Sequence, residues 1–337
     1  MTGLVITGWS ELIPPVDPAA DAAGLFDEPL PAARAAALVD FDVRAHLGRK
    51  GTSFYDRATA LAVVACAAAL RDSGIVVDEV GSARVGVVLG TTVGSFKSTS
   101  DFSRETLVQD KPYLVNPVLF PNTVMNCAAG QAAIRLGLRG VNATIAGGRL
   151  AMHQTLRYAV NALSRSTTEV LLVGAAEEFS PHRAWNGYRS GTDVGEGAAI
   201  FVVERADAPR HASPPVAALL GVASGFGWRE AAPAALAGCV RRALAAAEVE
   251  PSMVDLVATS AAGSGPDSEY AVAVDVLGRS PEHLAVGQLL GECDAATGAL
   301  GLAALLHRLR AEPTAVAVLT ARTPDGGAAA AVLRGVP

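Results

Sequence analysis

Apolar residues follow two patterns along the chain, and these patterns alternate. Short runs rich in Val, Ile and Leu predict strands, because branched side chains favour an extended backbone. Longer stretches with apolar residues at helical spacing predict helices. In the first part of the chain, the expected strands are residues 4–7, 84–89, 143–146, 170–173 and 198–203, and the expected helices are residues 56–72, 130–135 and 150–163.

The same alternation resumes after residues 206–215, a polar and proline-rich segment that we interpret as a link between two halves. Beyond it, the expected strands are residues 216–224, 256–258, 284–286, 315–320 and 328–334, and the expected helices are residues 234–247, 267–277 and 296–308. Strands that alternate with helices predict an α/β fold with helices packed on both faces of the sheet.

Composition argues against several functional classes. The 337-residue chain is 50% apolar and carries a mild net charge of −6, without a basic stripe of the kind that binds nucleic acids. The N-terminus lacks the basic and apolar regions of a signal peptide, and no apolar run reaches the length of a membrane span uninterrupted. We therefore expect a cytoplasmic protein that binds neither nucleic acid nor membrane.

A turn in the middle of the chain carries the main chemical signal. Residues 140–149 read as a strand followed by the tight turn Gly147-Gly148, and the helix at 150–163 comes next. This strand–turn–helix shape presents one side chain at a helix N-terminus, where backbone N–H groups favour a thiolate or an oxyanion. A covalent acyl-transfer enzyme has Cys or Ser there. This chain has Arg149, a permanent cation that cannot attack a thioester.

Several motifs fall in an order that resembles the β-ketoacyl synthases of the thiolase superfamily. They are MTGLVITGWS (1–10), FDVRAHLGRKGTSFYDRATALAVVACAAALRDSGI (41–75), RVGVVLGTTVG (84–94), NCAAGQAAIRLGLRG (126–140), EVLLVGAAEE (169–178) and GTDVGEGAAIFVVE (191–204). The resemblance implies a thiolase fold, with two similar βαβ halves in a five-layer α-β-α-β-α arrangement. We expect an N-terminal half at 1–210, carrying the turn and a dimer interface, and a C-terminal half at 211–337.

The resemblance also assigns the family's catalytic positions, and none keeps its catalytic residue. Arg149 stands at the nucleophile, and Ser260, in VDLVATSAAGS (254–264), stands at the first histidine. Within GQLLGECDAATG (287–298), Gly287 stands at the lysine and Glu292 at the second histidine. Thr192 stands at the gating phenylalanine.

Decarboxylative condensation requires the groups that are missing. A thiolate must hold the acyl chain, and neutral imidazoles must stabilise the enolate and the oxyanion. An ionised Glu292 would repel an enolate rather than stabilise it. We therefore predict no catalytic residues and no condensation by this chain alone.

Within the superfamily, this degeneracy resembles the chain length factor, the ketosynthase β subunit of type II polyketide synthases. That resemblance implies a heterodimer with an active ketosynthase, supplied by an acyl carrier protein whose phosphopantetheine arm the partner uses. The chain would bind no cofactor of its own and would shape the tunnel for the growing chain. It departs from that family in having Arg149 where glutamine is typical, and in being short.

The same resemblance implies two sets of non-catalytic site residues. The tunnel set lies within FKSTSDFSRETLV (96–108) and comprises Phe96, Thr99, Phe102 and Ser103. The dimer-interface set comprises Cys127, Val141, Asn142, Ala143, Thr144 and Ile145. For the two phenylalanines, an ordinary place in the interface core is an equal alternative. The small Thr99 and Ser103 would leave room for a long or rigid chain.

Two other functions stay open at this point. One is an acyltransferase-type enzyme with a relocated nucleophile, Cys293 or Cys127, and the other is a stand-alone acyl-binding or scaffold protein. Against relocation, the six histidines are scattered, and none is spaced to pair with a cysteine. His153 shares a helix face with Arg149, but we interpret it as satisfied by a neighbouring carbonyl. Cys66 and Cys239 read as core residues, and no cysteine spacing indicates a metal site.

Overall fold

A computed structural model of the chain describes residues 3–15, 25–31, 36–79, 81–208, 211, 213–260, 263 and 265–337. Its strands are β1 (Leu4–Leu12), β2 (Val85–Thr91), β3 (Asn142–Ala146), β4 (Val170–Glu177), β5 (Gly197–Arg205), β6 (Ala217–Phe226), β7 (Leu256–Thr259), β8 (Glu282–Leu284), β9 (Val316–Arg322) and β10 (Gly327–Gly335). They are hydrogen-bonded in the order β3-β2-β4-β5-β1-β6-β10-β9-β7-β8.

The strand order repeats in the two parts of the chain. From the central β1–β6 pair outward, the order is β1-β5-β4-β2-β3 in the first part and β6-β10-β9-β7-β8 in the second. In both parts this is the first, fifth, fourth, second and third strand along the chain. The second strand of each part, β2 or β7, runs parallel to its two neighbours, and the fifth, β5 or β10, runs antiparallel to its two. The expected boundary at 210/211 falls in the β5–β6 connection, where residues 209, 210 and 212 lie outside the described residues.

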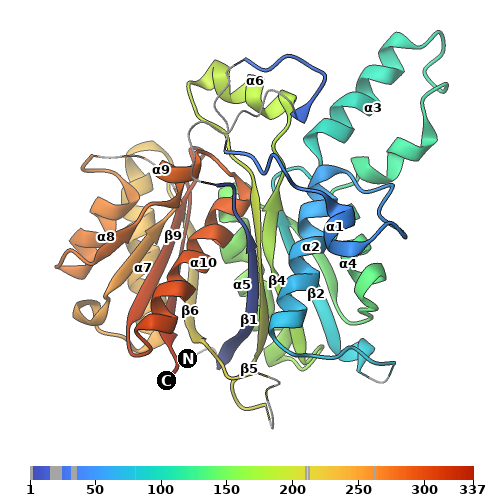
Figure 1. Ribbon diagram of the computed structural model, residues 1–337. Helices are drawn as coiled ribbons and strands as arrows, with labels where there is room; N and C mark the ends of the chain where they lie inside the picture. The colour runs from blue at the N-terminus through green and yellow to red at the C-terminus, as the bar shows by residue number, and fades with distance from the viewer. Residues whose placement is uncertain are drawn as a thin grey trace.

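Helices cover both faces of each half-sheet (Figure 1). The helices that pack on the sheet are α2 (Arg57–Asp72), α4 (Cys127–Leu136), α5 (Ala151–Ser164), α7 (Ala232–Ala247), α8 (Glu269–Leu277) and α10 (Ala295–Ala311). Helices α5 and α10 lie between the half-sheets, and their apolar residues share one core with strands of both. Helices α2 and α4 pack on the outer face of the first half-sheet, and α7 and α8 pack on that of the second. The expected α/β thiolase-type layering is confirmed.

Small residues make the central layer possible. A Cβ added at Gly298 on α10 would lie 2.9 Å from the Met152 Cβ on α5, so only glycine permits this close approach. Both helices begin at the same end of the molecule. The residues just before them, including Arg149 and Glu292, are thereby brought together.

The remaining helices are α1 (Val43–Leu47), α3 (Phe96–Val108), α6 (Pro181–Ser190) and α9 (Val286–Leu290), with short 3-10 turns that include η3 (Pro117–Thr123) and η4 (Gly148–Leu150). Helix α3 and η3 form an arm that projects from the body (Figure 1). Ser95 caps α3 by accepting a hydrogen bond from Ser98 N. No described helix is long and apolar enough to cross a membrane.

Most expected elements appear with shifts of a few residues at their ends. The strand expected at 284–286 is wrong, because β8 ends at Leu284 and α9 begins at Val286. A short apolar run fits either structure, and here the backbone turns into a helix. Helices α1, α6 and α9 were not anticipated from the sequence.

Candidate functional site

Arg149 lies in the turn η4, directly between the edge strand β3 and helix α5. Gly148 adopts a φ of +50°, which lets the chain reverse tightly at this point. The Arg149 guanidinium donates a hydrogen bond through Nη2 to Glu292 Oε2, forming an ion pair. The two side chains are only 23% and 14% exposed. The residues that the resemblance assigns to the nucleophile and second-histidine positions therefore bind each other.

This ion pair belongs to a larger charge network, formed by Arg149, Glu292, Asp294 and Arg183. The Asp294 N–H donates to Glu292 Oε1 at 3.0 Å. Arg183 forms an ion pair with Asp294 at 2.5 Å and donates to the Glu292 carbonyl at 3.1 Å. Burial by itself lowers the pKa of Arg149, but the hydrogen bond to Glu292 and the charges of Glu292, Asp294 and Glu269 together raise it above its ordinary value. Arg149 therefore stays charged and bound to Glu292.

Ser260, at the first-histidine position, is tied to a buried glutamate. Its Oγ donates to Glu269 Oε1 at 2.7 Å, and its N–H donates to Glu269 Oε2 at 2.9 Å. The Thr320 hydroxyl and the Arg322 N–H donate to the same carboxylate, at 2.9 and 3.1 Å. Glu269 also acts electrostatically on Arg149, so this cluster faces the charge network. A carboxylate with four donors holds structure together and leaves Ser260 no free base.

The other two assigned positions carry no reactive group. Gly287 is buried within α9. Thr192 is exposed on the loop before β5, where its N–H donates to the Gly187 carbonyl at 2.9 Å. The next residue, Asp193, accepts a hydrogen bond from the Glu292 N–H at 2.7 Å. The structure thus brings the Thr192 loop and Glu292 together.

The candidate relocated nucleophiles lie in settings that disfavour a thiolate. Cys293 is fully buried, and burial raises the pKa of its thiol. Burial likewise raises the pKa of Cys127, and the charge of Asp56 adds to that effect. In the described residues, the hydrogen-bond acceptor of the Cys127 thiol is Asn122 Oδ1 at 3.5 Å, and no hydrogen bond joins a cysteine to a histidine. Within the part of the chain that the structure describes, neither thiol is hydrogen-bonded to a histidine that could act as the base of nucleophilic catalysis.

His153 is buried, and its Nε2 lies 3.0 Å from the Leu319 carbonyl, as expected, while its Nδ1 has no hydrogen-bond partner among the described residues. Burial lowers the pKa of His153 to about 4, so the ring is neutral at physiological pH. Cys66 and Cys239 are buried core residues, as expected. Among the described residues, no His, Cys, Asp and Glu side chains gather in a group that could hold a metal ion.

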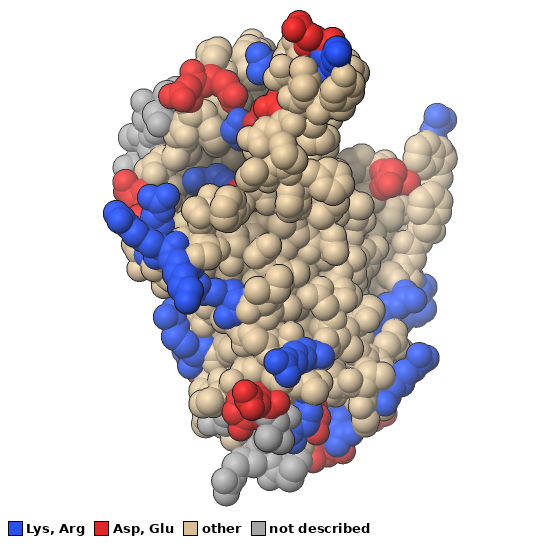
Figure 2. Space-filling view, turned by 90° about the vertical axis from the view of Figure 1, so that its right-hand side faces the viewer, with Lys and Arg blue, Asp and Glu red and all other residues tan. Residues whose placement is uncertain are grey.

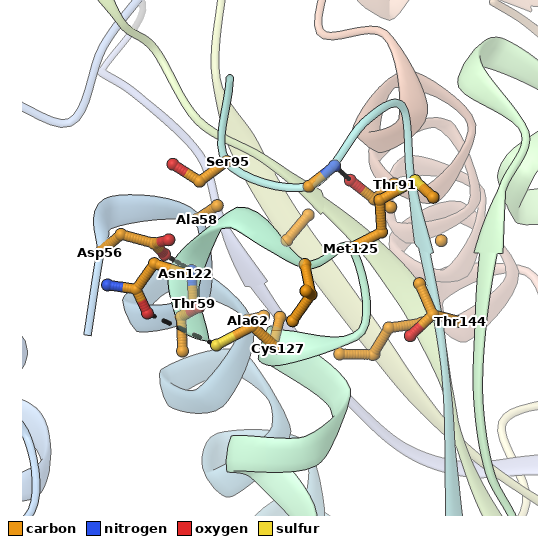
Figure 3. A pocket seen from close by; sticks show the side chains of 16 residues that line it. Asp56, Ala58, Thr59, Ala62, Thr91, Ser95, Asn122, Met125, Cys127 and Thr144 are labelled. Atoms are coloured by element: carbon orange, nitrogen blue, oxygen red, sulfur yellow. Dashed lines mark hydrogen bonds between the residues drawn. The ribbon is translucent and has the colours of Figure 1, made fainter. Parts of the chain in front are cut away.

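A pocket opens beside Cys127 (Figure 3). Its space, including the part open to solvent, is about 380 Å³. It is lined by Asp56, Ala58, Thr59, Ala62, Leu89, Gly90, Thr91, Gly94, Ser95, Asn122, Val124, Met125, Cys127, Ala128, Thr144 and Ala176. Asp56, Thr59 and Cys127 lie on one side of it, and Thr91 and Thr144 lie on the other. Of this lining, the sequence had singled out Cys127 and Thr144, both for the dimer interface and Cys127 also as a candidate relocated nucleophile.

The four expected tunnel residues lie outside this lining, on α3. The Phe96 ring lies 5.9 Å from the His182 ring, and the Phe102 ring lies 6.0 Å from the Phe120 ring. Ser103 is exposed, and its hydroxyl donates to the Thr99 carbonyl at 2.7 Å. The Thr99 hydroxyl is buried and has no hydrogen-bond partner among the described residues. Their place along a tunnel stays a prediction.

An apolar face surrounds the edge strand β3. The strand is only partly covered, although residues 141, 143 and 145 pack on the central core. Large apolar side chains are exposed on the α3–η3 arm and on α4, namely Leu107, Val108, Tyr113, Leu114, Val118, Phe120, Val124, Met125 and Ile134. Figure 2 views this side of the molecule, and its central part shows few charged residues. Exposed apolar surface of this extent marks an interaction site.

The fold and the site together define an α/β protein of the thiolase type in which Arg149 occupies the turn between β3 and α5. The profile of the β-ketoacyl synthase N-terminal domain matches residues 17–190, more than half of the 337-residue chain. This chain belongs to the β-ketoacyl synthase family.

Individual relatives agree with that assignment. The 3-oxoacyl-[acyl-carrier-protein] synthase 2 of Vibrio harveyi is 28% identical over 56% of this chain and 50% of its own length. The same enzyme of Staphylococcus aureus (strain COL) is 25% identical over 95% of this chain and 85% of its own length. The chain thus aligns with about half the length of the Vibrio relative. A solved structure described as "The ishigamide ketosynthase/chain length factor" is 33% identical, with a TM-score of 0.87, and covers 99% of this chain and 100% of that one.

Proposed function

We propose that this chain is a non-catalytic ketosynthase-like subunit, a chain length factor. In this role it forms a heterodimer with an active ketosynthase and shapes the tunnel for a polyketide or acyl chain. The observation that carries the proposal is the Arg149–Glu292 ion pair, which occupies the place where a ketosynthase needs a thiolate and an imidazole.

The chemistry of the charge network supports this role. Condensation needs a nucleophile to hold the acyl group and neutral donors to stabilise negative charge. Arg149 provides no nucleophile, and the ionised Glu292 opposes an enolate. Ser260 is already bound to Glu269. A partner must therefore supply the reaction centre.

The apolar face supports the proposal of a partner. An uncovered edge strand invites pairing with another chain, and pairing at β3 would extend the sheet into the second subunit. The face around it is apolar enough to be buried in a stable heterodimer. A solved structure of a ketosynthase/chain length factor is similar over nearly the full chain.

Substrate delivery follows from the same role. An acyl carrier protein would bring the growing chain on its phosphopantetheine arm to the partner's cysteine. This chain would hold no cofactor itself and would contribute walls to the tunnel. The complex as a whole would be a transferase of polyketide biosynthesis, of the kind that builds antibiotics.

Coexpression with a ketosynthase that retains the cysteine and both histidines tests this proposal. The two chains should copurify as a heterodimer. After incubation with acyl- and malonyl-loaded carrier protein, intact-mass spectrometry should find an acyl thioester on the ketosynthase alone. This chain alone should give neither condensation nor an adduct. A stoichiometric thioester on Cys127 or Cys293 would contradict the proposal and favour a relocated nucleophile. A well-behaved monomer that binds no such ketosynthase would also contradict it.

A further inference from the structure

The Arg149–Glu292 ion pair joins two parts of the chain that are distant in sequence, close to the end of the edge strand β3. The residues are 143 positions apart in sequence. Arg149 lies three residues after Ala146, where the edge strand β3 ends. Glu292 lies between α9 and α10, in the other half of the molecule. The pair therefore connects the end of the exposed strand to the C-terminal half.

The two sides of this connection differ in how firmly they are held. The Glu292 backbone donates to the Asp193 carbonyl and accepts from the Gly195 N–H at 3.0 Å and from Arg183. Its second carboxylate oxygen accepts from the Asp294 N–H. Glu292 is thus a fixed anchor.

The turn on the Arg149 side has weaker support. It follows two glycines, and η4 has no side-chain cap. Its backbone is tied by local hydrogen bonds: the Gly147 N–H donates to the Thr91 and Ile145 carbonyls at 3.0 and 3.1 Å, the Leu150 N–H donates to the Gly147 carbonyl at 3.1 Å, and the Ala151 N–H donates to the Gly148 carbonyl. Glycines give the backbone wide conformational freedom. An ion pair made by the Arg149 side chain can therefore restrict the conformations of this turn considerably.

We infer that Arg149 and Glu292 are positioning residues, whose ion pair holds the β3–α5 turn and thereby fixes the edge strand in the orientation that the partner binds. The inference rests on the proposed function. It assigns the former reaction centre a role in assembly. Preorganising a binding strand strengthens association, because less conformational freedom is lost on binding.

A double-mutant cycle measures this coupling. The variants are Arg149→Met, Glu292→Gln and both together, with Arg149→Lys as the conservative variant. Because the pair is largely buried, removing one member leaves the other charge uncompensated. Each single variant should therefore weaken ketosynthase binding by roughly tenfold. The double variant should lose no more than the worse single one, and Arg149→Lys should recover part of the affinity.

Two measurements separate positioning from general stability. Mass photometry on serial dilutions of the heterodimer gives the dissociation constant. Hydrogen exchange of the full chain at micromolar concentration reports on residues 142–150, where exchange should accelerate in the single variants more than in α7. Arg308→Met is the matched control, because it breaks the ion pair of Arg308 with Glu282 beside the opposite edge strand. It should change the dissociation constant by less than about twofold.

The outcomes are distinguishable. Unchanged affinity and unchanged exchange at 142–150 in Arg149→Met would overturn the inference, and so would additive losses in the double variant. A uniform acceleration of exchange with unchanged affinity would also overturn it, since the pair would then only stabilise the fold. A wild-type chain that binds no active ketosynthase would overturn the proposed function instead, and the exchange at 142–150 would still decide whether the pair holds the turn.

Discussion

The two edges of the sheet are topologically equivalent, yet they are built differently. β3 and β8 are each the third strand of their half and each pairs with the second. β3 has five residues and lies within an apolar face, whereas β8 has three and carries charge. Glu282 of β8 forms an ion pair with Arg308 at 2.6 Å, and the His283 ring stacks on Tyr270 at 4.1 Å. Short, charged edges resist pairing with other chains. The contrast supports the proposal that the β3 edge binds a partner, whereas the β8 edge is protected from pairing.

Proline at the centre of β3 should produce the largest effect. Val141 accepts a hydrogen bond from Val87, and Gly147 donates one to Thr91, both on β2. Because strand residues alternate, the Thr144 N–H points away from β2, toward an incoming strand. Thr144→Pro should weaken ketosynthase binding roughly 100-fold, about 2.7 kcal/mol, and leave the β2 ladder intact. Size-exclusion chromatography and mass photometry provide the measurement.

His283→Pro is the control for that prediction, since it places proline at the outward position of β8. Its effect on binding should be negligible. Equal losses in both variants would mean that proline merely disrupts the sheet, and the contrast between the edges would fail.

Glu178 should give the β3 side of the molecule a pH effect of its own. Glu178, at the base of the arm, accepts hydrogen bonds from Lys97 N at 2.9 Å and from the Ser95 hydroxyl at 3.2 Å. Burial raises its pKa from 4.5 to about 7, with Asp56 and Glu177 adding to the rise. The folded state therefore binds this proton more tightly than the unfolded state. The contribution to the free energy of unfolding is full below pH 4.5 and is lost as the pH rises through about 7.

Glu178→Gln should remove part of that slope, on the order of 2 kcal/mol across the window. Denaturant unfolding of wild type and variant at both ends of the window measures it. Burial also raises the pKa of Glu177 to about 7, so the contribution of Glu177 to the pH dependence of unfolding should remain in the variant. Hydrogen exchange should place the change in α3 rather than near β8. An unchanged slope in the variant would contradict the assignment to Glu178.

Larger side chains on α3 should have the smallest effect on stability and binding, but they should change the length of the product. If Thr99 and Ser103 line the shared tunnel, Thr99→Trp or Ser103→Phe should shorten the product at similar turnover, because overpacked sites accept little extra volume. Mass spectrometry of products from the reconstituted pair measures this, and Arg104→Trp, at an exposed neighbouring position, is the control.

If the heterodimer stays intact and the product lengths do not change, α3 does not line the tunnel. Cys127→Phe offers the complementary test, since Cys127 lines the pocket that the structure does show. Shortening by this variant alone would place the chain end in that pocket.

The sequence predicted the fold further than it predicted the site. Runs of Val, Ile and Leu mark buried strands directly, so most strands were found, while Leu284–Val286 was too short to separate strand from helix. The resemblance placed Arg149 and Glu292 at catalytic positions, but their ion pair went unnoticed. The signal was available, because the two positions that the resemblance assigns to the nucleophile and the second histidine carry opposite charges. The pocket lining draws on several elements, and only tertiary packing brings them together.

The Ser260–Glu269 cluster has an evolutionary consequence. A histidine at position 260 would remove a hydroxyl donor from a buried carboxylate that now has four donors. A cysteine at position 149 would similarly leave the partly buried charge of Glu292 without its ion-pair partner. Each single step toward a working ketosynthase thus passes through a chain with a poorly satisfied buried charge, and such charges are costly. Under the proposed function, the loss of catalysis would be entrenched, since its reversal would require several coordinated substitutions, none of them favourable alone.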